Sequence, residues 1–203
     1  MARHLEFFFD LSSPWTYLAF TNVQPLIART GASATFRPIL VGGVFNAVNQ
    51  SVYAAREQSD NRKLQHSWKV LGDWARLAGV EMNFPSRWHP AKSVAAMRFA
   101  TALEPDQPAL IAFARAAFES YFGAQDNLAE PAVLEAAATR AGLDGAAIRD
   151  AAASDAVKAR LRANTDEVIA RGGYGSPSMF VDGDDMYFGN DQLPLVEAAL
   201  LKA

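Results

Sequence analysis

The stretch "FFFDLSSPWTYLAF", Phe7 to Phe20, decides how the rest of the chain is interpreted. Its aromatic run has no helical period, which is typical of a buried strand. Ser13 followed by Pro14 is a helix start signal, because serine caps helix N-termini and proline suits the first helical position. The stretch therefore predicts a strand over His4–Asp10 that runs directly into a helix beginning at Pro14.

A second strand is predicted just beyond this helix, at "ATFRPIL", Ala34–Leu40. A strand, a helix and a second strand in this order close most simply as a parallel pair with the helix as crossover. Within the helix, Pro25 is expected to cause a kink or to end the regular part, because proline removes a backbone donor.

Between about residues 46 and 172 the sequence becomes alanine-rich and helical in spacing. Residues with capping or breaking character divide this block into several helices. The expected boundary residues are Asp60 or Asn61 for the first helix, Glu130-Pro131 and Ser154-Asp155 for later starts, and Gly172-Gly173 for the last stop.

Strand character returns after Gly173, with a hairpin turn expected at Asp182-Gly183 and Asn190 expected to cap a closing helix. The order βαβ, helical block, ββα resembles a thioredoxin-like layout of the α/β class. Residues 1–45 and 173–203 would form the thioredoxin-like domain, and residues 46–172 a large all-helical domain inserted in its middle.

Composition narrows the possible functions. The 203 residues carry a formal net charge of -3, which gives no reason to bind nucleic acid. Because the chain has no cysteine, disulfide exchange is excluded and any sulfur chemistry needs an external thiol. No metal site is expected, since the three histidines lie far apart. No secretory or membrane-spanning segment is evident, so a cytoplasmic protein is expected.

Ser13 has two possible roles. It can be a simple N-cap, or its hydroxyl at the positive end of the helix dipole can hold an anion such as an external thiolate. A serine hydrolase is a poor alternative, because there is no G-x-S-x-G motif and no histidine in a recognisable partner context. The position of Ser13 at the first strand-to-helix turn favours the thiolate.

Two later motifs support a ligand site. Ser176-Pro177, just before a strand, stands where thioredoxin-like folds place a cis proline, which lets the preceding backbone pair with a ligand. Asn190 and Asp191 in "FGND" can cap the closing helix, and the same side chains can accept hydrogen bonds from the ammonium group of a ligand.

Together, "FFFDLSSPWTYLA", "RPILVGGVFNAVNQ", "WARLAGV", "YGSPSMFVDG" and "FGNDQL" resemble the 2-hydroxychromene-2-carboxylate isomerases and the related kappa-class glutathione transferases. The resemblance covers nearly the whole chain and implies a homodimer that uses glutathione. Ser13 would be the catalytic residue that holds the glutathione sulfur. The implied glutathione-binding residues are Ser13, Ser176, Pro177, Phe188, Gly189, Asn190 and Asp191, and the implied substrate-binding residues are Gly43, Phe45, Asn49, Gln50, Lys63, Trp88 and Lys92.

The chain departs from the family pattern mainly on the substrate side. Asn49-Gln50 replaces the common Gly-Asn, so the role of the family asparagine falls on either residue. Gln192 replaces a common arginine, Lys92 an asparagine and His66 a frequent tyrosine. Glutathione dependence is therefore better supported than the identity of the substrate.

The reaction implied by the resemblance interconverts 2-hydroxychromene-2-carboxylate and trans-o-hydroxybenzylidenepyruvate in aromatic catabolism. A thiolate that adds reversibly in conjugate fashion allows rotation about the former double bond. Lys63, Arg87 and Lys92 are candidates to meet the substrate carboxylate. Two alternatives remain open: a kappa-type glutathione transferase or peroxidase that acts on another electrophile, and a non-catalytic thioredoxin-like binding module.

Overall fold

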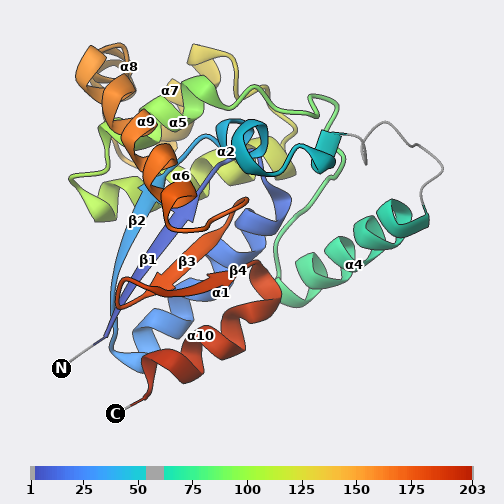
Figure 1. The fold of residues 1–203 in the computed structure, drawn as a ribbon. Helices are drawn as coiled ribbons and strands as arrows, with labels where there is room; N and C mark the ends of the chain where they lie inside the picture. Colours follow the sequence, from blue (N-terminus) through green and yellow to red (C-terminus); the bar gives the residue numbers. More distant parts are fainter. Residues whose placement is uncertain (1–2, 54–61, 203) are drawn as a thin grey trace.

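A mixed four-stranded sheet lies at the centre of the computed structural model, which describes residues 3–53 and 62–202 (Figure 1). Its strand order is β2-β1-β3-β4. The strands are β1 (His4–Phe9), β2 (Ser33–Pro38), β3 (Ser178–Val181) and β4 (Asp185–Phe188). β1 pairs with β2 in parallel and with β3 antiparallel, while β3 and β4 form an antiparallel hairpin. The predicted parallel pair and the hairpin are both confirmed.

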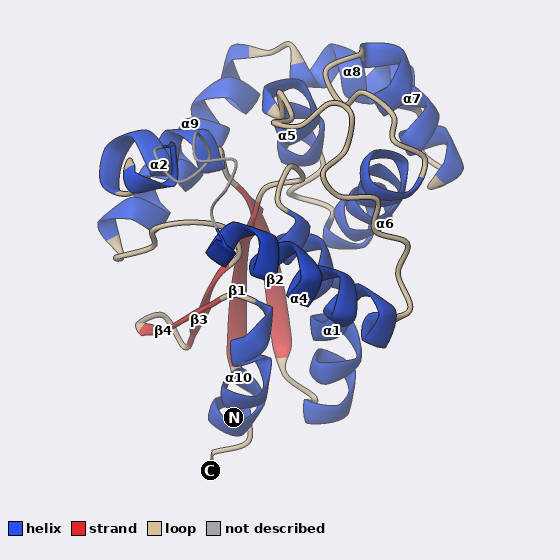
Figure 2. Cartoon of the chain, turned by 90° about the vertical axis from the view of Figure 1, so that its right-hand side faces the viewer, coloured by secondary structure: helices blue, strands red, loops and turns tan. Residues whose placement is uncertain are grey.

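Helices cover both faces of the sheet. One face packs against α1 (Pro14–Thr30) and α10 (Leu193–Leu200), the other against α2 (Val41–Val48) and α9 (Asp155–Ala170). The other helical elements of the described residues are α4 (Arg62–Ala78), α5 (Val94–Ala102), α6 (Gln107–Phe118), the π-helix η1 (Glu119–Gly123), α7 (Pro131–Arg140), α8 (Gly145–Ala152) and the 3-10 turn η2 (Asn190–Gln192). α5 to α8 gather beyond one end of the sheet, and α4 lies beside α1 (Figures 1 and 2).

β1 explains why an aromatic run forms the central strand. Phe7 and Phe9 face the core under α1, where Phe20 and Phe36 pack against them. Phe8 faces the opposite side and packs edge-on against Phe180. All of these rings are buried. A strand covered on both faces requires apolar residues at successive positions, as this one has.

Most of the predicted helix boundaries are confirmed. α7 begins at Pro131, and the Ser154 hydroxyl accepts the Val157 N–H at the start of α9. Gly172 adopts a left-handed φ of 89° just after α9 ends. Helical structure begins earlier than residue 46, because α2 starts at Val41. The caps proposed at Asp60 or Asn61 lie outside the described residues.

One expectation is wrong, and another is only partly met. α1 continues through Pro25 to Thr30, so of the two effects expected of this proline, an end of the helix does not occur. Asn190 does not cap α10, whose N-cap position is Gln192. The Asn190 side chain turns instead toward α1, where its Oδ1 accepts a hydrogen bond from Asn22 Nδ2 at 2.9 Å.

A cluster of ion pairs joins the sheet to α9. Arg37 on β2 is only 8% exposed and bonds Glu6 on β1 at 2.8 Å and Glu167 on α9 at 2.6 Å. Arg171, just beyond α9, bonds Glu6 at 2.6 Å and lies over the Phe180 ring. The network connects elements from both ends of the chain.

Within the two described ranges, no helix is long and apolar enough to cross a membrane.

Candidate active site

The turn between β1 and α1 holds Ser13 at the N-terminus of α1. Its Oγ accepts the Thr16 N–H at 3.2 Å, as an N-cap should, and donates to the Ser176 carbonyl at 3.1 Å. Pro14 occupies the first turn of the helix. The Ser13 hydroxyl therefore lies where the helix dipole is positive and backbone N–H groups face an incoming anion.

Ser176 connects the last strand region to this turn. Its peptide bond to Pro177 is cis, as predicted. The Ser176 Oγ accepts the Asp10 N–H at 2.9 Å and bonds the Thr16 hydroxyl at 2.7 Å. These contacts bring together Ser13 and Ser176, which are 163 positions apart in the chain.

Asp10 lies behind the turn with no exposed surface. Its Oδ1 accepts the Ser12 N–H at 2.9 Å and the Ser12 hydroxyl at 2.7 Å, while its Oδ2 accepts the Val41 N–H at 2.8 Å and the Ser93 hydroxyl at 3.1 Å. Burial raises the pKa of the Asp10 carboxyl above its ordinary value, and these four hydrogen bonds oppose the rise. Asp10 thus anchors three separate segments of chain.

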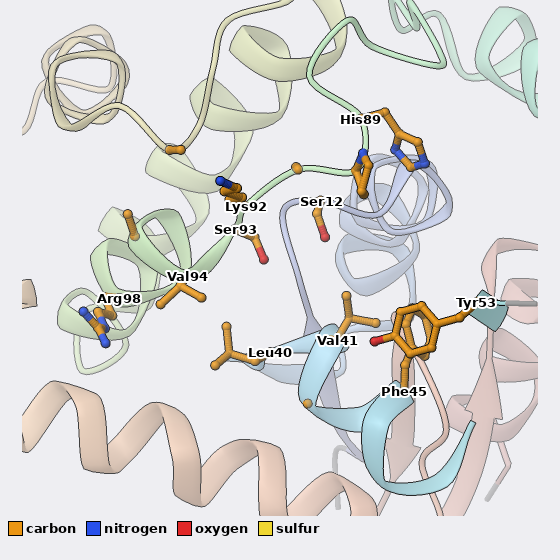
Figure 3. A pocket seen from close by; sticks show the side chains of 16 residues that line it. Ser12, Leu40, Val41, Phe45, Tyr53, His89, Lys92, Ser93, Val94 and Arg98 are labelled. Atoms are coloured by element: carbon orange, nitrogen blue, oxygen red, sulfur yellow. The ribbon is translucent and has the colours of Figure 1, made fainter. Parts of the chain in front are cut away.

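Those three segments form walls of a cavity of about 630 Å³. This volume suits a small molecule with one or two rings. Its lining includes Ser12, Gly43, Phe45, Tyr53, Lys92 and Arg98. In Figure 3, Lys92 and Arg98 lie toward one end, Phe45 and Tyr53 toward the other, and Ser12 between them. Since Ser12 precedes Ser13, the cavity adjoins the N-terminus of α1.

The turn before α10 holds four of the residues assigned to glutathione. The Phe188 ring packs at a tilt against Tyr174, with ring centroids 4.4 Å apart. Gly189 has a φ of 87°, and a Cβ there would lie 2.8 Å from Asp191 Oδ1, so only glycine suits this position. Asn190 is buried, and its Nδ2 has no hydrogen-bond partner among the described residues. Asp191 is exposed.

Several residues assigned to the substrate lie outside the cavity lining. Asn49 donates to the Tyr174 carbonyl at 3.1 Å, and Gln50 donates to the Asn46 carbonyl at 3.0 Å. The Trp88 indole donates to the Gln125 carbonyl at 2.9 Å. Lys63 is exposed near the start of α4. Gly43, Phe45 and Lys92 do line the cavity.

Sequence reasoning missed Asp10, Ser12, Ser93 and Arg98. A carboxylate that ends a buried aromatic strand was a usable signal for Asp10, because such a group needs hydrogen-bond donors. Arg98 stands alone as a cation in the apolar stretch "SVAAMRFATAL". Nothing in the local pattern pairs Ser93 with Asp10, which lies 83 positions away. No acidic or histidine cluster suited to a metal ion occurs in the part of the chain that the structure describes.

The fold and this turn define a protein of the thioredoxin class. Residues 4–201 match the DSBA-like thioredoxin domain family, and the chain belongs to that family.

Within this family, the chain is similar to proteins of two named kinds. The chain is 29% identical to the 2-hydroxychromene-2-carboxylate isomerase of Sphingobium xenophagum, covering 99% of this chain and 100% of the relative. It is 27% identical to glutathione S-transferase kappa 1 of Rattus norvegicus, over 96% of this chain and 89% of that protein. A solved 2-hydroxychromene-2-carboxylate isomerase superposes with a TM-score of 0.78 at 25% identity, over 97% of this chain and 94% of that one. Curated relatives along nearly the full chain are thus named as isomerases and kappa transferases.

Proposed function

We propose that this protein is a glutathione-dependent isomerase that interconverts 2-hydroxychromene-2-carboxylate and trans-o-hydroxybenzylidenepyruvate. The observation that carries the proposal is Ser13, a hydroxyl at a helix N-terminus beside the Ser176 carbonyl, in a chain without cysteine. The names of the relatives support the choice of reaction.

The residues around the turn fit glutathione. The buried Asn190 Nδ2 is a donor without a partner, and the exposed Asp191 carboxylate can accept from an ammonium group. Gly189, which precedes them, has a left-handed φ of 87°, and a Cβ there would lie 2.8 Å from Asp191 Oδ1. Ser176 precedes the cis proline, and the Pro177 carbonyl accepts the Gly189 N–H at 3.3 Å, which holds this segment beside the turn.

The chain's own groups would act as follows. Bound glutathione would supply the thiolate that the chain lacks, and reversible conjugate addition of a thiolate turns a carbon–carbon double bond into a single bond that rotates. Ser13 would redirect its proton from the Ser176 carbonyl to the sulfur, and with the α1 dipole it would favour the anionic thiolate. Phe45 would contact the aromatic ring of the substrate, and Lys92 would attract its carboxylate.

Glutathione titration followed by tryptophan fluorescence, calorimetry and the ultraviolet absorbance of thiolate tests the proposal. Trp15 lies two positions from Ser13 and should report binding. We expect saturable binding by the native protein and loss of the thiolate signal in Ser13→Ala. Ser154→Ala is the matched control: it removes another N-cap, with a similar loss of about 1 kcal/mol, and should leave glutathione binding unchanged. No binding at millimolar glutathione would sink the proposal.

A kappa-type transferase is the second candidate, favoured by the kappa relatives. The two reactions differ in the fate of glutathione. A transferase would leave a stable conjugate, whereas the isomerase would return glutathione unchanged. Mass spectrometry of the products after many turnovers separates them. Ser13→Cys, with its own thiol at the turn, is expected to form a mixed disulfide with oxidised glutathione, which the native protein cannot.

A further inference from the structure

Arg98 is a partly buried cation at one end of the cavity. It follows Val94 by four positions on α5, so the two side chains share a helix face, and both line the cavity. No hydrogen bond or ion pair links Arg98 to any described residue. Other partly buried arginines of this chain do have acidic partners, as Arg37 and Arg171 have Glu6. The Arg98 guanidinium therefore differs from these arginines in having no acidic partner among the described residues.

The surroundings of Arg98 add to this positive character. Lys92 lines the same cavity just before α5, and no hydrogen bond or ion pair joins it to the described residues either. Ser93 stands at the N-cap position of α5, but its hydroxyl donates to Asp10 and makes no capping bond. Within residues 3–53 and 62–202, no side chain accepts a hydrogen bond from the first N–H groups of α5, and such free N–H groups favour a negative group nearby.

The other end of the cavity is aromatic. Phe45 and Tyr53 meet edge to face, with ring centroids 6.4 Å apart. The Tyr53 hydroxyl donates to Asn46 Oδ1 at 2.8 Å, which fixes the orientation of its ring. A ligand complementary to both ends of the cavity has a planar ring system at the aromatic end and a carboxylate at the Arg98 end.

We propose that Arg98, assisted by Lys92 and the start of α5, binds the carboxylate of a planar aromatic acid whose rings lie against Phe45 and Tyr53. Arginine suits this task because its guanidinium bonds both carboxylate oxygens. Arg98 would then decide the preference for acids over neutral ring compounds. The claim that such an acid is the substrate rests on the proposed function, whereas the binding preference does not.

Calorimetry with chromone-2-carboxylate and chromone-2-carboxamide, both without glutathione, tests this subsite. The two probes share shape and differ in charge. We expect the native protein to bind the carboxylate about tenfold or more tightly than the amide. Arg98→Gln should reduce that ratio to about one to three, and Arg98→Lys should keep part of it. Arg115→Gln, which changes an arginine lining a different cavity, should retain the full ratio.

Equal affinity of the native protein for both probes, or binding of neither, would overturn the subsite. Retention of the full preference in Arg98→Gln would overturn it as well. Circular dichroism of each variant checks that it is folded, and the comparison of the two probes on the native protein needs no variant. Normal glutathione binding without a carboxylate preference removes the subsite alone, and a carboxylate preference without glutathione binding removes the proposed function alone.

Discussion

Asp10 is the residue that joins three walls of the cavity. Its four hydrogen bonds all use carboxylate oxygens as acceptors, and the donors come from the α1 turn, the start of α2 and the residue before α5. Because the Asp10 carboxylate is buried, water cannot replace any of these hydrogen bonds when one is lost. Asp10 thus positions the side chains of Ser12 and Ser93.

Asp10→Asn should destabilise the protein by about 3 kcal/mol, because the amide loses one acceptor oxygen and turns its NH2 toward other donors. Urea unfolding measures the change. Asp150→Asn, the same change on the exposed face of α8, should stay within about 0.5 kcal/mol of the native protein. Equal stability of Asp10→Asn and the native protein would mean that these hydrogen bonds do not anchor the walls.

Two glycines in helices show how closely the helices approach. At Gly145, the first residue of α8, a Cβ would lie 2.7 Å from the Glu135 carbonyl oxygen of α7. At Gly72, inside α4, nothing lies within 4 Å of such a Cβ. The close contact between α7 and α8 therefore requires glycine at position 145, whereas the middle of α4 has room for a side chain at position 72.

Gly145→Ala should lower the free energy of unfolding by about 2 kcal/mol, since backbone atoms must move to admit the methyl group. Gly72→Ala should raise it by about 0.5 to 1 kcal/mol, because alanine favours helix. Thermal unfolding of both variants measures the contrast in sign. A stabilising Gly145→Ala would show that α7 and α8 can separate without loss.

Much of the architecture was predictable, because periodicity and turn residues are local signals. The Phe7–Phe9 run, the Ser13-Pro14 start and the Asp182-Gly183 turn each specify an element within a few positions. The arrangement of the site was harder to predict from the sequence. Asn190 looks like a cap in sequence but bonds Asn22, 168 positions away, and the environment of Arg98 depends on segments that only the fold brings together.

The ion-pair network around Arg37 ties the molecule together. Desolvation opposes ionisation of Glu6 and Glu167, but hydrogen bonds and charges from Arg37 and Arg171 outweigh it and lower the pKa of both carboxyls below 4.5. A lowered folded-state pKa stabilises the protein above the unfolded value, and this stability is lost as the pH falls through the folded-state value.

Arg37→Met should therefore destabilise the protein by about 3 kcal/mol at neutral pH, and by progressively less as the pH falls through the lowered folded-state pKa values of the two carboxyls. Urea unfolding across this pH range measures the effect. Arg149→Met, which breaks exposed ion pairs on α8, should change stability little at any pH. A loss in Arg37→Met that did not depend on pH would assign the effect to packing instead of charge.

The position of β1 in the sheet constrains the order in which the protein can be assembled as it is synthesised. β2 follows soon after β1, but the strand on its other side, β3, comes only after all of α2 to α9. On the ribosome, one edge of the aromatic strand β1 therefore has no partner until residues 178–181 emerge. Nascent chains halted before that point should depend on chaperones, and those halted after it should not.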